Sequence, residues 1–227
     1  MHNQTSFLEK LLEYIKGFEH QLPELPDGIL PLLPYNQEEV LELAKQFYNK
    51  FYSNNNTRSL ILGINPGRLG AGSTGIPFTD AKRLFEDCGI QNQLKSYEPS
   101  SVFIYKMIEA YGGVELFYSD FFISSTSPIG FVKNGKNYNY YDEKNLLTRL
   151  KPYMLFQLER LLNLDLKRNK VFCLGEGKNY QFLNEMNKSK QWFGEIQPLP
   201  HPRFIVQYKS KELDAYIDRY LQAFILK

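Results

Sequence analysis

Short apolar runs alternate with helix-like patterns over most of this chain. Runs of roughly four to eight residues that are rich in branched and aromatic side chains are typical of buried strands. Such runs cover Arg58–Ile64, Phe121–Thr126, Val171–Leu174 and Gly194–Leu199. Helical patterns cover Thr79–Cys88, Ser101–Tyr111, Glu143–Leu162, Lys178–Met186 and Ser210 to about Leu226. The alternation predicts an α/β fold, a three-layer sandwich in which helices cover both faces of a central, mostly parallel, four-stranded sheet.

The first 52 residues have the pattern of a helical extension. Ser6-Phe-Leu-Glu9 matches a capping box and predicts a helix that runs to about Leu22. The prolines between Pro23 and Pro34 predict an irregular segment that no helix can cross. Asn36 is the expected N-cap of a second helix, because glutamates follow it in the first turn. We therefore expect a single domain over residues 1–227, with residues 1–52 packed on it as an extension.

Composition limits the class of protein. The 227 residues are 43% hydrophobic and 23% charged, which is ordinary for a globular domain. A net charge of +2 is only mildly basic, so it permits a nucleic-acid partner without indicating one. The two cysteines, Cys88 and Cys173, are too few for an iron–sulfur cluster held by four thiolates, and Cys173 lies in an apolar run that predicts burial. Because the sequence shows neither an apolar leader segment nor a stretch of membrane-spanning length, we expect a soluble, cytoplasmic protein.

A glycine-rich stretch, ILGINPGRLGAGSTGIPF at residues 61–78, contains at Gly70–Gly75 the pattern G-x-G-x-x-G of a dinucleotide-binding turn. That pattern requires the first glycine directly after a strand and the third in the first turn of a helix. Here the predicted strand ends near Ile64, Pro77 disfavours a helical residue 76, and no acidic residue follows a second strand at the expected spacing. The phosphate-loop pattern also fails, because Ile76 stands where a lysine is needed. We therefore reject the dinucleotide interpretation.

A second interpretation is a rigid ligand-binding loop at the carboxyl edge of the first strand, where open α/β sheets bind ligands. The glycines let a ligand approach the backbone closely, and Pro66 and Pro77 stiffen the loop. Asn65 offers a neutral amide and Phe78 a flat ring, a combination that suits a planar heterocycle. Taken singly, each residue has a simpler explanation, since Asn65 can bond to its own turn and Phe78 can belong to the core.

Three segments resemble motifs of the uracil-DNA glycosylase superfamily. Gly63-Ile-Asn-Pro-Gly67 followed by Thr74-Gly-Ile-Pro-Phe78 closely resembles the first motif, and the nearest branch is the single-strand-selective monofunctional (SMUG) type. Leu199–Tyr208, with its His-Pro pair, occupies the place of the second motif, and Ser124–Pro128 occupies that of a short middle motif. The resemblance spans roughly Arg58 to the C-terminus, and it implies the uracil-DNA glycosylase-like form of the α/β sandwich.

The resemblance implies roles for particular residues. In the family, the second-motif histidine stabilises charge on the departing base, and His201 takes this role by position. The first-motif polar residue, here Asn65, orients the attacking water. His201 alone of the three histidines follows a predicted strand, and a parallel sheet brings both residues to the same edge. The resemblance also implies substrate contacts at Ile64, Gly67, Phe78 and Ser125.

Two departures from the family pattern bear on specificity and on contact with DNA. Ser125 stands where SMUG-type enzymes carry an asparagine that reads the pyrimidine edge. A hydroxyl rotates to donate or accept, so we expect weaker discrimination, extending to bases such as xanthine or hypoxanthine. Arg203 and Phe204 replace the family's Ser-Pro after His-Pro. We expect Arg203 and Lys209 to neutralise phosphates and Phe204 to wedge into the gap that the base leaves, although a solvated turn explains Lys209 nearly as well.

The sequence therefore predicts a monofunctional DNA glycosylase that removes uracil or related deaminated bases in base-excision repair. Asn65 can only position water, because an amide does not take a proton near neutral pH, so the reaction depends on a good leaving group. We expect a monomer whose partner is DNA, with no lysine nucleophile, metal or cofactor. Two alternatives stay open: a nucleic-acid-binding protein of the same fold that has lost catalysis, and an enzyme that acts on a small nucleotide in the same cleft.

Overall fold

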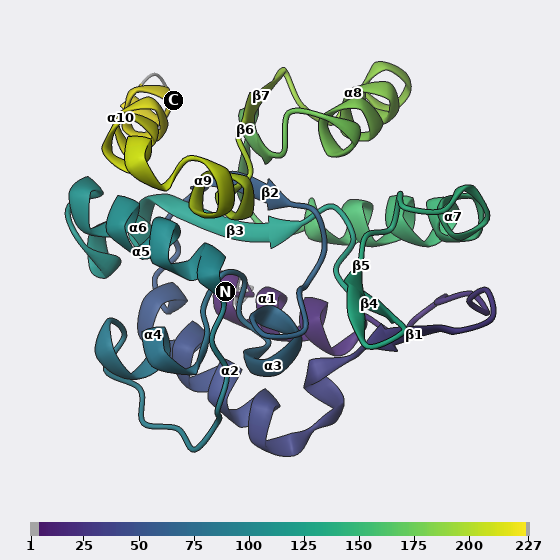
Figure 1. Cartoon of the computed structure of the whole chain (residues 1–227), viewed down its shortest axis with the longest axis horizontal. Helices are drawn as coiled ribbons and strands as arrows, with labels where there is room; N and C mark the ends of the chain where they lie inside the picture. The colour runs from purple at the N-terminus through teal and green to yellow at the C-terminus, as the bar shows by residue number, and fades with distance from the viewer. Residues whose placement is uncertain (1–4, 226–227) are drawn as a thin grey trace.

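A parallel four-stranded sheet lies at the centre of the computed structural model, which describes residues 5–225 (Figure 1). Its strands, in spatial order, are β3 (Phe121–Ser125), β2 (Arg58–Gly63), β6 (Leu166–Leu174) and β7 (Glu195–Leu199). All neighbouring pairs are parallel, so the four strands end at the same edge of the sheet. The predicted α/β fold with its four-stranded parallel sheet is confirmed.

Helices cover both faces of this sheet. The neighbouring residues Phe121 and Phe122 point to opposite faces, as successive residues of a strand do. Phe121 packs against Phe224, with ring centroids 4.5 Å apart, whereas Phe122 packs against Phe7 and Tyr52. Aromatic burial thus fixes a helical layer on each side. The helices that supply these residues, and the long helix packed beside Phe224, are α1 (Phe7–Lys16), α2 (Glu38–Tyr52), α5 (Pro99–Tyr111) and α10 (Leu213–Ile225).

A second apolar cluster lies beside the main core, where two helices meet a small antiparallel sheet (Figure 1). The helices are α7 (Lys144–Leu161) and α8 (Lys178–Lys190), and the strands, in spatial order, are β1 (Ile29–Leu32), β4 (Gly130–Lys133) and β5 (Lys136–Tyr138). Asn134 and Gly135 connect β4 to β5 with φ values of 50° and 70°. Left-handed values at both positions are what a tight type I′ hairpin requires.

Strand β1 corrects the predicted course of the Pro23–Pro34 segment. We expected an irregular connection there, but Ile29–Leu32 pairs with β4 in antiparallel register. β1 is an edge strand, and proline is tolerated at an edge because no second neighbour needs its missing N–H. Its partner lies far away in the sequence, so the local pattern did not reveal the pairing.

Two boundaries in the N-terminal region also differ from the prediction. The capping box at Ser6 is present, but α1 ends at Lys16, several residues early, because a glycine follows. Gln37, not Asn36, precedes α2, and it makes no side-chain cap. The Asn36 amide instead donates to Glu19. An amide engaged in this way does not cap the helix.

The segment after His201 forms a helix where none was predicted. Pro202 occupies the first helical position, where its fixed φ suits the helix and its missing N–H costs nothing. The last predicted helix begins at Leu213 rather than Ser210, and its predicted end at Leu226 lies outside the described residues. The remaining short elements are η1 (Pro34–Asn36), α3 (Ala71–Thr74), α4 (Ala81–Glu86), α6 (Val114–Asp120), α9 (Pro202–Tyr208) and η2 (Ser210–Glu212).

Candidate active site

Segments at the carboxyl edge of the central sheet enclose a cavity of about 130 Å³. Its walls come from the loop after β2, the end of β3, the start of α5, the β4–β5 hairpin and the start of α9. The predicted site residues that line it are Ile64, Asn65, Gly67, Phe78, Ser125, His201 and Arg203. The predicted DNA contacts Phe204 and Lys209 lie outside its lining.

The glycine-rich loop folds differently from a dinucleotide-binding turn. Its short helix α3 begins after Gly70 and ends at Gly75, which has a φ of 75°. In the dinucleotide pattern the third glycine lies at the start of a helix, whereas Gly75 terminates one. A side chain at position 75 would also collide with the ring of Tyr35. These glycines therefore serve the packing of the loop itself.

Backbone groups hold the Asn65 amide in one orientation. Its Nδ2 donates to the carbonyl oxygens of Pro66 and Tyr138, each at 3.3 Å. Its Oδ1 accepts from the N–H of Tyr140 at 3.2 Å. Since a backbone N–H only donates and a carbonyl only accepts, these partners fix which amide atom faces which way. Both hydrogens of Nδ2 are engaged, while Oδ1 keeps a second lone pair that can accept from a water molecule.

The hairpin segment that orients Asn65 is itself anchored to the sheet. The hydroxyl of the buried Tyr140 donates to Oδ1 of Asn179 in α8 at 2.8 Å. Nδ2 of Asn179 donates to the carbonyl oxygens of Gly63 and Leu174, the last residues of β2 and β6. These bonds tie the Asn65 amide to two strand ends. Sequence reasoning missed Tyr140 and Asn179, because neither belongs to a local motif.

Phe78 and Ser125 meet at the end of β2. Gly63 pairs with Ser125 in parallel register, and a Cβ added to Gly63 would lie 3.4 Å from both the Phe78 ring and Ser125 Oγ. Phe78 has a φ of 54°, a left-handed value that is rare for a bulky residue. Unusual backbone conformations of this kind cluster at functional sites, because only the surrounding structure can impose them.

His201 is the N-cap residue of α9. Its Nδ1 accepts from the backbone N–H of Arg203 at 3.1 Å. A ring nitrogen that accepts carries no hydrogen, so the neutral imidazole has its hydrogen on Nε2 and donates from there. The His201 ring centroid lies 5.8 Å from that of Phe78. The cavity therefore combines a flat aromatic ring with a hydrogen-bond donor.

Two effects keep the His201 imidazole neutral. Burial, and secondly the charge of the nearby Arg203 guanidinium, lower the pKa of His201 to about 4. Both effects disfavour an imidazolium cation. At neutral pH His201 is therefore an uncharged donor.

The outer face of α9 adjoins the cavity. Arg203 lines the cavity and is exposed to solvent. Phe204 and Tyr208 are 44% and 67% exposed, and their ring centroids lie 5.6 Å apart. Lys209 forms an ion pair with Glu212 at 2.9 Å. The charge of Lys209 is thus already paired, whereas Arg203 lines the cavity and the two rings are exposed on the same helix.

Comparisons with known proteins agree with this arrangement of residues. The family model of the uracil DNA glycosylase superfamily matches residues 50–225. The chain belongs to the uracil DNA glycosylase superfamily. The crystal structure of wild-type SMUG2 from Pedobacter heparinus is similar to it over 98% of each chain, with 44% sequence identity and a TM-score of 0.95. A search of the curated proteins found no match.

These findings confirm the resemblance that the three sequence motifs indicated. Membership of the uracil DNA glycosylase superfamily supports a uracil-DNA glycosylase-like function and DNA as the macromolecule on which the protein acts. The match to the family model extends over most of the chain, from the last residues of α2 to the end of α10.

In this superfamily member the cavity also contains polar residues that sequence reasoning did not single out. They are Glu98, Ser100, Asn137 and Asn139. Glu98 and Ser100 come from the start of α5, and the two asparagines come from the hairpin. Oδ1 of Asn137 accepts from the backbone N–H of Arg68 at 2.9 Å, which ties the hairpin to the glycine-rich loop. No signal in the sequence marked these residues, because polar side chains in loops are common.

Residues 5–225 also bear on metal binding, membrane insertion and the cysteines. Within this range, no group of three or more His, Cys, Asp or Glu residues is arranged to hold a metal ion. No helix of the same range is both long and apolar enough to cross a bilayer. Cys88 and Cys173 are buried free thiols, and the predicted burial of Cys173 is confirmed.

Proposed function

We propose that this protein is a monofunctional DNA glycosylase that hydrolyses the N-glycosidic bond of uracil or a related deaminated base in DNA. One observation carries the proposal: Asn65, Phe78 and His201 line a single cavity at the carboxyl edge of the sheet. The reaction needs three groups in one place: a flat surface for the base, a hydrogen-bond donor for its oxygen and a group that positions water. We further propose that the protein acts in the cytoplasm as a monomer in base-excision repair, with no metal or cofactor.

The first step is entry of the base into the cavity. The target atom of a stacked nucleotide is out of reach, so the nucleotide must leave the duplex or arrive from a single strand. Phe78 stacks on the base that enters, an interaction worth roughly 1–3 kcal/mol per base. Its imposed backbone conformation supports this role, because the ring is in place before the base arrives. The backbones of Ile64 and Gly67 line the rest of the base site.

His201 acts on the departing base. When the C1′–N bond breaks, its electron pair stays with the base, and a uracil-like base carries the charge on its oxygens and nitrogen. The Nε2–H of His201 donates to one of these oxygens. One preorganised donor of this kind is worth about 100- to 1,000-fold in rate. The neutral state of the imidazole supports the assignment. At neutral pH His201 donates from its Nε2–H without having to be protonated first.

Asn65 positions the attacking water. Oδ1 has a lone pair left after accepting from Tyr140, and a water molecule that donates to it is held at a defined place. The amide cannot take the proton of that water. Bases that leave well are therefore favoured, and cytosine, which leaves less readily, is disfavoured.

Ser125 sets the breadth of the substrate range, and α9 holds the DNA. A rotating hydroxyl accepts from or donates to the edge of a base, so a deaminated purine such as xanthine or hypoxanthine can be admitted beside uracil. Arg203 contacts a phosphate and Phe204 fills the gap left by the base. Lys209 adds a weaker phosphate contact, because Glu212 already pairs with it.

The test is a base panel. Single-stranded and duplex oligonucleotides that carry uracil, xanthine, hypoxanthine or 5-hydroxymethyluracil are incubated with the protein, and alkali then cleaves any abasic site. We expect strand cleavage at uracil and at one or more of the deaminated purines, and cleavage about 100-fold slower with the Asn65→Ala protein prepared in parallel. DNA binding without cleavage of any oligonucleotide would indicate a catalytically inactive binding protein. Base release from free nucleotides but not from DNA would indicate a small-nucleotide enzyme.

A further inference from the structure

Glu98 places a carboxyl group in the cavity that also holds Asn65 and His201. Its Oε2 is buried and makes no hydrogen bond within the described part of the chain. A buried carboxyl oxygen without a partner is costly, because it has lost its water and gained nothing in return. Because Glu98 lines the cavity, its carboxyl group is placed to gain a partner when a substrate enters.

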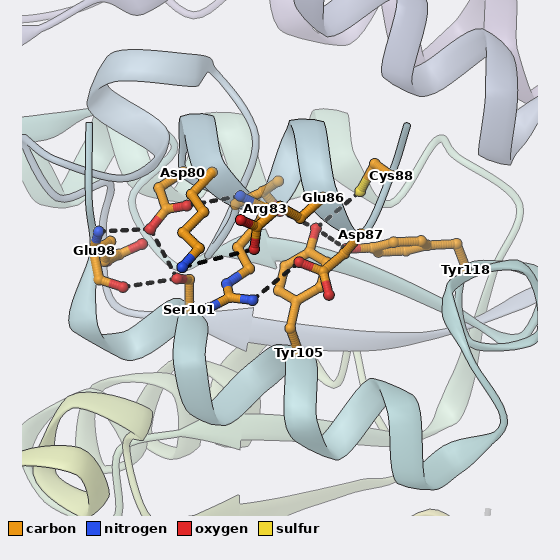
Figure 2. A network of polar contacts seen from close by, with 11 residues as sticks. Asp80, Arg83, Glu86, Asp87, Cys88, Glu98, Ser101, Tyr105 and Tyr118 are labelled. Carbon is orange, nitrogen blue, oxygen red and sulfur yellow. Dashed lines mark hydrogen bonds and ion pairs between the residues drawn. The ribbon is translucent and has the colours of Figure 1, made fainter. Parts of the chain in front are cut away.

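The backbone of Glu98 is held rigidly by its neighbours (Figure 2). Its N–H donates to Oδ2 of Asp80 at 2.7 Å, and its carbonyl oxygen accepts from Oγ of Ser101 at 2.7 Å. The Ser101 hydroxyl shares its single hydrogen with Asp80 Oδ2, which lies 2.9 Å from Oγ. Asp80 in turn caps α4 by accepting from the N–H of Arg83. The network joins the starts of α4 and α5 and fixes where the Glu98 side chain leaves the backbone.

Two glycines of the loop after β2 make room for the Glu98 carboxyl. A Cβ added to Gly70 would collide with this carboxyl, and one added to Gly67 would lie 3.5 Å from Oε1. Gly67 follows Asn65 by two positions in the same loop. The carboxyl therefore lies directly against the loop that carries the proposed water-positioning residue. Gly70, which belongs to the misleading dinucleotide pattern, has this packing role.

Burial and nearby charges together place the titration of Glu98 near neutral pH. Burial, and then the nearby Asp80 carboxylate, raise the pKa of Glu98 to about 7, while the Arg203 guanidinium opposes the shift. Asp80 lies before α4 and Arg203 lies in α9, and these are the charged groups that act on it. A carboxyl of this kind is present in both its proton-accepting and its protonated form under ordinary conditions.

Among residues 5–225, no other side chain that lines the cavity can take a proton at neutral pH. Amides and hydroxyls do not accept one in this range, and arginine has no acceptor. His201 already carries a hydrogen on Nε2, and its pKa of about 4 keeps Nδ1 unprotonated. The amide and hydroxyl residues are Asn65, Ser100, Ser125, Asn137 and Asn139.

We propose that Glu98 is a catalytic residue that accepts the proton of the attacking water, which Asn65 positions but cannot deprotonate. The water oxygen bonds to C1′ of the sugar while the C1′–N bond breaks and its electron pair leaves with the base. One water proton passes to the Glu98 carboxylate and from there to solvent, and the base takes up a proton from solvent. This inference rests on the proposed glycosylase function and adds the missing base to it.

The test is the pH dependence of the single-turnover rate of base release. For the wild-type protein we expect the rate to rise about tenfold per pH unit from about pH 5 and to level off above about pH 7, as a general base loses its proton. Glu98→Gln keeps the size of the side chain but cannot accept a proton. Its rate should be lower by about 100-fold or more at the plateau and should not change with pH. Glu109→Gln, an exposed glutamate in the same helix, should match the wild type throughout.

Further measurements keep the outcome decisive. Thermal unfolding shows whether Glu98→Gln is folded; if it is not, Glu98→Asp, which retains a titrating carboxyl, should keep the slope of the profile with a lower plateau. A wild-type protein that releases base at a rate independent of pH would overturn the role of Glu98 and leave the glycosylase function intact. The same holds for a Glu98→Gln protein that keeps the wild-type rate and profile. A wild-type protein that releases no base at any pH would instead contradict the proposed function.

Discussion

The backbone N–H of Arg203 donates to Nδ1 of His201 over 3.1 Å, so a single hydrogen bond both starts helix α9 and fixes the tautomer of the imidazole. The same bond excludes protonation at Nδ1, and the Arg203 guanidinium nearby adds to this by disfavouring a second positive charge. The helix cap at Nδ1 and the proposed catalytic donor at Nε2 thus belong to the same imidazole ring. A substitution at His201 therefore affects both the stability of α9 and the proposed hydrogen-bond donor.

Replacement of His201 by alanine should slow chemistry and spare DNA affinity. The proposed Nε2–H donor acts on charge that exists in the transition state, so the single-turnover rate should fall about 100- to 1,000-fold. Loss of the N-cap should cost about 1 kcal/mol of stability. Single-turnover kinetics and DNA binding are measured side by side, with His20→Ala, an exposed histidine, as the control. If His201→Ala lost DNA affinity and kept its bound-state rate, His201 would be a binding residue.

Replacement of Asn65 by alanine should have a similar kinetic result for a different reason. Without Oδ1 the attacking water loses its holder, and a lost positioning contact costs about 100-fold in rate. DNA affinity should stay near that of the wild type, because Asn65 contacts no phosphate in this mechanism. The exposed Asn163→Ala variant is the matched control. A wild-type rate in Asn65→Ala would mean that the water is held by another group.

Arg203 should contribute to holding DNA rather than to chemistry. Arg203→Ala should weaken binding at low salt and reduce the slope of log affinity against log salt by about 0.9, the value of one phosphate contact on duplex DNA. The saturated single-turnover rate should change little. Salt titrations of DNA binding test this, with Arg149→Ala, an exposed arginine of α7, for comparison. An unchanged salt slope would place Arg203 away from the phosphates.

The strands and the motif residues could be predicted because their signals are local. β2 is a short apolar run buried along its whole length, and Asn65 and Phe78 follow it within one loop. His201 lies two residues after the end of β7, so the parallel arrangement of the strands was enough to bring it to the same edge as Asn65. In each case a few neighbouring residues carried the information.

What could not be predicted depends on contacts between distant segments. β1 becomes a strand because β4 pairs with it, and the orientation of Asn65 depends on Tyr140. Glu98 reaches the cavity because Asp80 ties α5 to α4, and because glycine at position 70 leaves space for the carboxyl. A lone glutamate before a proline gives no sign of such an arrangement. A residue whose pKa is raised to about 7 in the cavity was therefore invisible in the sequence.

Ser125 should govern which bases are released. Ser125→Asn introduces a fixed amide at the cavity wall beside Gly63, and it should lower the rate on xanthine and hypoxanthine relative to uracil. Ser125→Ala, which removes the hydroxyl without adding an amide, should not narrow the range. Relative single-turnover rates across the base panel decide the matter. Unchanged ratios in Ser125→Asn would show that this side chain does not touch the base.

Glu98→Gln should make the protein more stable at alkaline pH. Folding raises the pKa of Glu98 from 4.5 to about 7, so the folded state holds this proton more tightly than the unfolded chain does. The stability that depends on Glu98 is therefore fully present below about pH 4.5 and is lost as the pH rises through about 7.

Glutamine removes this loss, because it has no proton to give up. The difference in unfolding free energy between Glu98→Gln and the wild type should be smallest in acid and should grow to about 1–3 kcal/mol above neutral pH, after allowance for partial solvent screening. Urea unfolding at several pH values measures it, with the exposed Glu109→Gln variant unfolded in parallel as the matched control. If the two unfolding curves kept a constant separation at every pH, Glu98 would titrate alike in the folded and unfolded chains. If Glu98 serves chemistry at a cost in stability, Glu98→Gln should both stabilise the protein and abolish the pH dependence of the rate.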